Sequence, residues 1–128
     1  MFMLFVSISL ISAGSLPLSF ADPPDTVTGL GKSKISSATE IYLTWNAPAD
    51  NGETITGYKI ESARESSFNN FAAYTTVTST TGSTATTYTV SSLSQGDFFK
   101  FRVSAINNDG TGGTSNEFMT GTAHGAED

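Results

Sequence analysis

The amino-acid sequence predicts an all-β protein, built as an antiparallel sandwich or small barrel. Two observations support this fold class. Beyond residue 21, apolar and polar side chains alternate with period two in several short stretches, as they do in half-buried strands. Segments rich in Gly, Asn, Asp, Ser and Pro separate these stretches and are typical of tight turns. No segment in this part of the sequence has the periodicity of a helix, so helical and mixed folds are not expected.

The strand pattern is clearest at residues 41–45, 55–62, 86–90 and 99–105. Side chains of a strand point alternately to its two faces, and one face of each stretch is apolar. We expect this face to form the core, with Ile41, Leu43, Trp45, Tyr58, Ile60, Tyr88, Val90, Phe99, Phe101, Val103 and Ala105 pointing inward. The opposite face carries Lys59, Glu61, Lys100, Arg102 and Ser104. We interpret it as a solvated sheet surface rather than as a docking strip for an acidic partner.

Length, charge and cysteine content limit the possible functions. The 128 residues allow one domain. The chain has no Cys, which excludes a disulfide scaffold and a cysteine-ligated metal. Its net charge of −6 argues against binding to nucleic acid, because such binding needs clustered Lys and Arg.

The first 21 residues contain no charged side chain and are strongly apolar. We interpret residues 1–21 as a signal peptide, cleaved before Asp22, because Ser19 and Ala21 provide small side chains at positions −3 and −1. The alternative is a retained membrane anchor, since about 20 apolar residues can span a bilayer. Pro17 and several Ser residues favour the signal peptide. The predicted protein is therefore secreted or on the cell surface, with a domain over residues 22–123, a flexible tail over 124–128 and no membrane insertion of the mature domain.

From residue 23 to about residue 123, the order and spacing of motifs resemble the fibronectin type III family. The first half contributes Pro24, the pattern Ile-x-Leu-x-Trp at 41–45 and the stretch from Asp50 to Ile60. The second half contributes Tyr88-x-Val90-x-x-Leu93 and the longer stretch from Gly96 to Gly112. Each motif alone is weak evidence, but their order and spacing together are specific.

The resemblance implies a seven-stranded antiparallel immunoglobulin-like sandwich with sheets A-B-E and C-C′-F-G. The strands would occupy residues 27–30 (A), 41–45 (B), 55–62 (C), 71–77 (C′), 86–90 (E), 98–107 (F) and 116–123 (G). Trp45 would be the central aromatic residue of the core.

In this topology the loops at residues 46–54, 79–85 and 107–114 meet at one pole of the sandwich. Loops in such a position commonly contain the residues that bind a partner. The candidate ligand-binding residues are Asp50, Asn51, Glu53, Asn107, Asn108 and Asp109. Their oxygen atoms suit a hard cation such as Ca²⁺ or hydrogen bonds to a sugar. The same residue types also build tight turns without binding anything, and both interpretations stand.

The expected function is a non-catalytic interaction module that binds an extracellular protein or glycan through these loops. The alternative is a structural spacer or a fragment of a larger extracellular multidomain surface protein. Enzyme chemistry is not expected, because the single imidazole, His124, lies in the predicted tail and cannot serve a well-held catalytic triad. We expect no cofactor and a monomeric state.

Exposed aromatic side chains help to discriminate between module and spacer, because a cluster favours a partner site. The aromatic residues in question are Tyr42, Phe68, Phe71, Tyr74 and Phe98. Strand parity directs Tyr42 and Phe98 outward on different sheets. The sequence therefore predicts no single aromatic patch.

One departure from the family pattern generates a prediction, because Phe99 stands where the family usually has Tyr. The hydroxyl of that Tyr donates a hydrogen bond to the preceding loop, an interaction known as the tyrosine corner. Such a bond contributes about 1 kcal/mol net. We expect Phe99→Tyr to stabilise the domain by about this amount, measured as a higher denaturant midpoint. An unchanged or lower midpoint would contradict both the prediction and the register of strand F.

Overall fold

The computed structural model describes residues 21–124, which form nine strands and no helix. They are β1 (Thr28–Lys32), β2 (Ile41–Asn46), β3 (Gly57–Ser67), β4 (Asn70–Phe71), β5 (Thr75–Thr78), β6 (Thr87–Val90), β7 (Phe98–Asn107), β8 (Gly110–Thr111) and β9 (Phe118–Gly121). The predicted signal peptide, apart from Ala21, and residues 125–128 of the predicted tail lie outside the described residues. Within the described part of the chain, no helix is long and apolar enough to cross a membrane.

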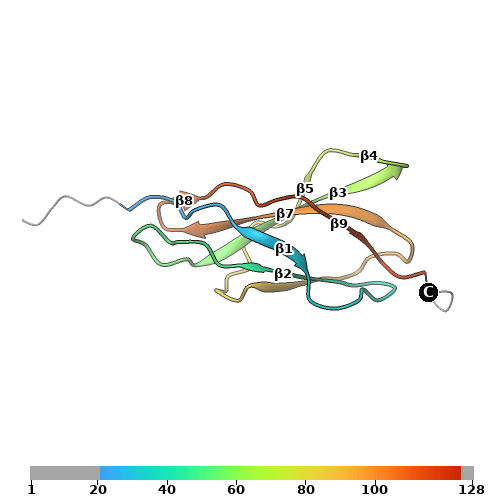
Figure 1. The fold of residues 1–128 in the computed structure, drawn as a ribbon, viewed down its shortest axis with the longest axis horizontal. Coiled ribbons are helices and arrows are strands. Elements are labelled where there is room, and N and C mark those ends of the chain that lie inside the picture. Colours follow the sequence, from blue (N-terminus) through green and yellow to red (C-terminus); the bar gives the residue numbers. More distant parts are fainter. Residues whose placement is uncertain (1–20, 125–128) are drawn as a thin grey trace, which may run out of the picture.

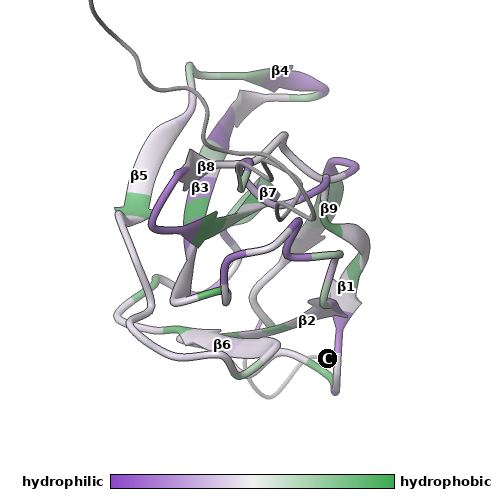
Figure 2. Ribbon diagram, turned by 90° about the vertical axis from the view of Figure 1, so that its left-hand side faces the viewer, coloured by the Kyte–Doolittle hydropathy of each residue, from purple (hydrophilic) through white to green (hydrophobic). Residues whose placement is uncertain are grey.

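The strands form two antiparallel sheets that face each other (Figures 1 and 2). One sheet has the order β1-β2-β6, which is the predicted A-B-E sheet. In the other sheet β3 and β7 are central, β5 pairs with β3, and β9 pairs with β7. This order is the predicted C′-C-F-G arrangement. The fold class is therefore confirmed as an immunoglobulin-like sandwich.

The strand count is nine rather than the predicted seven, because two short hairpins add β4 and β8. Strand β3 continues beyond Ser62 to Ser67 and pairs there with β4. Asn69, with φ of 58°, makes the turn of this hairpin. The chain then leaves the sheet and returns as β5, so the predicted C′ strand at residues 71–77 is divided in two. At the other pole, β8 pairs with the end of β7 before the chain continues to β9.

The core lies between the sheets and contains the predicted inward residues, of which only Tyr88 remains half-buried. At its centre the ring of Trp45 meets the edge of Tyr58, with centroids 5.0 Å apart and planes at 62°. Burial raises the pKa of the Tyr58 phenol. Ser104 is a correction, because its side chain is buried rather than solvated. It is a short side chain on the central strand β7, where it pairs with Lys59 of β3.

Strand β1 begins and ends slightly later than the predicted strand A at residues 27–30. Its pairing with β2 shifts between Thr28 and Gly31. Gly29 has φ of 71° at this irregularity, a conformation that a bulge allows Gly to adopt at little cost. Beyond the bulge, Gly31 and Lys32 continue the pairing with Thr44 and Leu43.

Candidate functional site

The loops predicted to converge do meet at one pole of the sandwich, at the left-hand end of Figure 1. The loop after β2 contacts the end of β7, since the Thr56 amide donates a hydrogen bond to the Ile106 carbonyl at 2.8 Å. The loop between β5 and β6 contacts the start of β3. There the Thr81 amide donates to the Tyr58 carbonyl at 2.8 Å, and the Tyr58 amide donates to the Thr81 hydroxyl at 3.1 Å.

Asn107 ties this pole together and is buried. Its Nδ2 donates hydrogen bonds to the carbonyl oxygens of Asp22 at 2.8 Å, Asp50 at 3.0 Å and Glu53 at 3.2 Å. Its Oδ1 accepts from the amides of Asp109 at 2.8 Å and Gly110 at 3.2 Å. One side chain thus joins the N-terminal segment, the loop after β2 and the turn after β7. Its polar atoms are occupied within the protein, so Asn107 positions the pole rather than contacting a ligand.

Asn51 and Asp50 also build the loop in which they lie. Asn51 adopts φ of 59°, and its Nδ2 donates to the Pro23 carbonyl and to Asp25 Oδ1, both at 2.9 Å. Asp50 Oδ1 accepts a hydrogen bond from the Gly52 amide at 3.0 Å, which is an Asx turn. The amide group of Asn51 is therefore used internally, whereas Asp50 is exposed and retains its second carboxylate oxygen.

The remaining candidates face the solvent to different degrees. Asn108 and Asp109 are exposed at the tip of the turn after β7, and Glu53 is half-buried. Within residues 21–124, no group of three or more His, Asp or Glu side chains is arranged to hold a metal ion. Calcium binding at this pole stays a prediction. A ligand that binds only the folded state raises the temperature at which the protein unfolds. Calcium binding would therefore raise the midpoint of heat denaturation as calcium is added.

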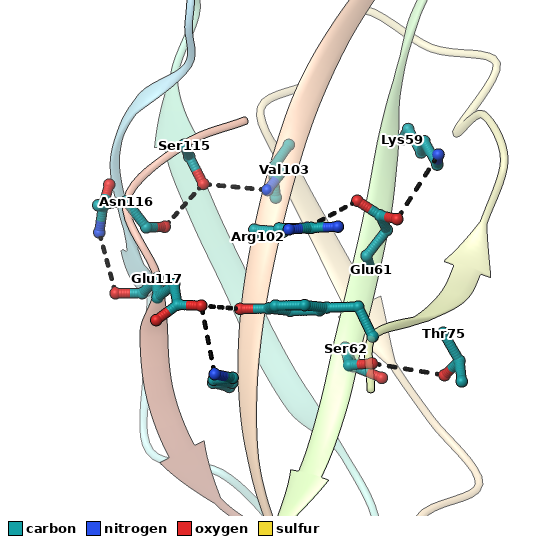
Figure 3. Close-up of polar contacts among 11 residues, drawn as sticks. Lys59, Glu61, Ser62, Thr75, Arg102, Val103, Ser115, Asn116 and Glu117 are labelled. Atoms are coloured by element: carbon teal, nitrogen blue, oxygen red, sulfur yellow. Dashed lines mark hydrogen bonds and ion pairs between the residues drawn. The ribbon is translucent and has the colours of Figure 1, made fainter. Parts of the chain in front are cut away.

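The outer face of the second sheet carries charges that are paired with one another (Figure 3). Arg102 Nε donates to Glu61 Oε1 at 2.9 Å, and Lys59 Nζ lies 3.6 Å from Glu61 Oε2. The hydrogen bond from Arg102 lowers the pKa of Glu61. Lys100 Nζ lies 3.4 Å from the carboxylate of Glu117. These three cations and two carboxylates are paired with one another on the half-buried outer face of the sheet.

Tyr74 also belongs to this charged face, although the sequence pattern did not predict it there. Its hydroxyl donates to Glu117 Oε2 at 2.6 Å, which lowers the pKa of that carboxyl. Burial, together with the Glu117 acceptor, raises the pKa of the Tyr74 phenol. The guanidinium carbon of Arg102 lies 3.9 Å from the centroid of the Tyr74 ring, within the range of a cation–π interaction.

The predicted absence of an aromatic patch is wrong for three of the five residues considered. The rings of Phe71 and Phe98 have centroids 6.4 Å apart. Lys100 Nζ lies 5.0 Å from the Phe71 centroid and 5.3 Å from that of Tyr74. The β3–β4 hairpin brings Phe71 back beside β7, a fold-back that strand parity does not reveal. Tyr42 lies on the other sheet, as predicted, in β2.

The protein is thus an immunoglobulin-like sandwich in which the side chain of Asn107 joins the loops at one pole. The family model of the fibronectin type III domain matches residues 11–120, and the chain belongs to this family. Phe99 and Asn107 both fall within the matched range.

A curated relative with this similarity is "Cell adhesion molecule-related/down-regulated by oncogenes" from Xenopus laevis. It is 39% identical over 75 residues, which are 59% of this chain and 6% of the relative. Among solved structures, the titin kinase with its flanking domains has a TM-score of 0.65 and 31% identity, covering 80% of this chain and 18% of that one. Domains FN1–FN3 of chicken CNTN1 have a TM-score of 0.67 and 26% identity, covering 79% and 33%. This chain thus spans a small part of each.

The role of Asn107 is tested by comparing it with its exposed neighbour. Asn107→Ala removes several hydrogen bonds, each contributing about 1 kcal/mol net, and should lower the free energy of unfolding by about 2–3 kcal/mol. The matched variant Asn108→Ala should change it by less than about 0.5 kcal/mol. Chemical denaturation measures both. Equal losses in the two variants would contradict the assignment of Asn107 as the residue that fixes the pole.

The ion pair of Glu61 predicts a pH dependence of stability. Because the folded-state pKa of Glu61 is lowered, its stabilising contribution is present above the unfolded value of 4.5 and is lost as the pH falls through the folded value. Glu61→Gln should therefore reduce the loss of unfolding free energy between pH 7 and about pH 3. Denaturation at a series of pH values measures this loss. Glu53→Gln is the control, since Glu53 has no ion pair within the described residues. An identical pH profile for Glu61→Gln and the unsubstituted protein would contradict the prediction.

Proposed function

We propose that this protein is a non-catalytic interaction module outside the cell that binds a protein or a glycan through the loops at the Asn107 pole. The observation that carries the proposal is the fixation of three chain segments by the Asn107 amide. Asp50, Asn108 and Asp109 are exposed on two of the segments that Asn107 joins.

A fixed pole suits recognition, because loops that are ordered before binding lose little conformational entropy when a partner arrives. The exposed groups are carboxylates and an amide, which accept and donate hydrogen bonds. They match sugar hydroxyls, and equally the amides and cationic side chains of a protein surface. The partner class is therefore polar or basic rather than apolar.

Location outside the cell is supported by the apolar, uncharged first 21 residues and by the similarity to a cell adhesion molecule-related protein. The absence of catalysis is supported by the surroundings of the polar groups. His124 is exposed, and Asp50 and Glu53 lie on a surface loop. Such a loop does not supply the apolar burial that raises the pKa of a catalytic acid.

A structural spacer is the second candidate function, and one observation favours it. The matched region makes up 6% of its curated relative and 33% of the three-domain CNTN1 structure, so the same unit recurs within longer chains.

The proposal is tested by substituting the exposed tip of the pole. The variant combines Asn108→Ala with Asp109→Lys, and the matched control combines Asn70→Ala with Glu65→Lys in the β3–β4 hairpin. Both variants change the net charge equally and alter one exposed Asn. Binding is measured on a glycan array and by pull-down from cell-surface fractions, after heat denaturation has shown that both variants are folded.

We expect a partner to bind the unsubstituted protein and the control and to be lost with the pole variant. Equal retention of the partner by all three proteins would contradict recognition through this pole. Binding to nothing in either assay would favour the spacer.

A further inference from the structure

A second surface lies between the two sheets, where the edge strands β1 and β9 run along one margin of the sandwich (Figures 1 and 2). Within residues 21–124, strand β1 pairs with β2 alone and β9 with β7 alone. In this part of the chain each therefore has one edge that pairs with no other strand. Natural sheets usually blunt such edges with charges, Pro or a covering segment, because an open edge is ready to pair with another chain.

Two contacts bridge this margin, and the strands separate between them. Near one end the side-chain amide of Asn116 bonds both the amide and the carbonyl of Leu30, at 3.2 and 3.3 Å. Near the other end the Ala123 amide donates to the Ser37 carbonyl at 2.9 Å. An open groove of about 440 Å³ lies towards the second bridge, lined by Lys32, Ile35, Ser36, Phe98 and residues 119–124. We call it the β1–β9 groove.

The β1–β9 groove gathers the exposed apolar side chains of the domain. Among the described residues, four large apolar side chains are exposed: Ile35 at 84%, Phe68 at 96%, Phe98 at 38% and Met119 at 54%. All but Phe68 line this groove. Gly121 lies opposite Phe98 on β9 and leaves room for its ring, since a Cβ atom there would come within 2.9 Å of the Phe98 ring. Exposed apolar side chains concentrated in one concave surface indicate a binding site.

The groove is also cationic in a protein of net charge −6. Of the six basic residues, Lys59, Arg64, Lys100 and Arg102 form ion pairs within the described part of the chain. Lys32 and Lys34 form none there, and Lys32 lines the groove. Lys34 points elsewhere, with its Nζ 4.3 Å from the centroid of the Tyr42 ring. The groove thus offers an apolar surface and one uncompensated ammonium group.

We propose that the β1–β9 groove binds an extended peptide of a partner protein in which a large apolar side chain neighbours an acidic one. The backbone of such a peptide pairs with the open edge of β9, a mode known as β-augmentation. Its apolar side chain covers Ile35, Met119 and Phe98, and its carboxylate pairs with Lys32. Charge complementarity selects this occupant, because a second copy of this acidic chain would bring net repulsion to the contact.

The test begins with a random seven-residue peptide library displayed on phage and selected against the immobilised protein. The affinity of the most enriched peptide is then measured by fluorescence polarisation for four variants. Lys32→Glu is matched by Lys34→Glu, which makes the same charge change outside the groove. Ile35→Ser is matched by Phe68→Ser, which removes another highly exposed apolar side chain that does not line the groove.

We expect enriched peptides that place Asp or Glu beside a large apolar residue. Lys32→Glu and Ile35→Ser should each weaken binding by about tenfold or more, whereas the two matched variants should leave it within about twofold. Enrichment of no such sequences, or equal effects of the groove variants and their controls, would overturn the proposal. Self-association in sedimentation that Ile35→Ser abolishes would assign the groove to a second copy and would also overturn it.

The inference is independent of the proposed function, because the β1–β9 groove and the Asn107 pole share no residue. The Asn108→Ala and Asp109→Lys variant should bind the selected peptide normally. Loss of peptide binding in that variant would show that the two surfaces are not separate.

Discussion

The pairing of β3 with β7 is the constraint on which the rest of the structure depends. It runs without interruption from Gly57 opposite Ile106 to Arg64 opposite Phe99. Because neighbouring side chains point to opposite faces, this register places Tyr58 and Val103 in the core and Glu61 and Arg102 on the outer face. A slip of one residue would exchange the two faces. Strand β7 ends at Asn107 and so places this residue at the loop pole. The core, the charged face and the pole therefore all depend on the register between β3 and β7.

Most of the fold was predictable from the sequence, because period-two alternation is a local signal. It correctly placed the core residues of β2, β3 and β7. The two-sheet order was implied by the resemblance to the fibronectin type III family and is confirmed. The division of the predicted C′ strand was not predictable, since it depends on how far β3 extends before Asn69 turns the chain. The burial of Ser104 was not predictable either, because alternation assigns a side chain to a face and does not tell how far that face is covered.

The candidate site was predictable as a set of loops but not in the roles of its residues. The Asn107 amide contacts backbone carbonyls 54, 57 and 85 residues away, and its acceptors include no distinctive side chain. A sequence pattern cannot distinguish such an Asn from Asn108, which is exposed. Similarly, Tyr74 bonds Glu117 across 43 residues. Both contacts join segments that are far apart in the sequence, and this explains why local patterns assigned neither.

The reach of the Asn107 amide also sets an order of events during synthesis. Asp22 and Asn107 are 85 residues apart, and the ribosome releases the chain from its N-terminus. At about 5–20 residues per second, the segment around Asp22 waits roughly 4–17 s before its partner has been made. Strand β7 is made after β3, so β3 also lacks its central neighbour for part of this time. The domain therefore completes its fold only after β7 has been made, and its unpaired strands need protection until then.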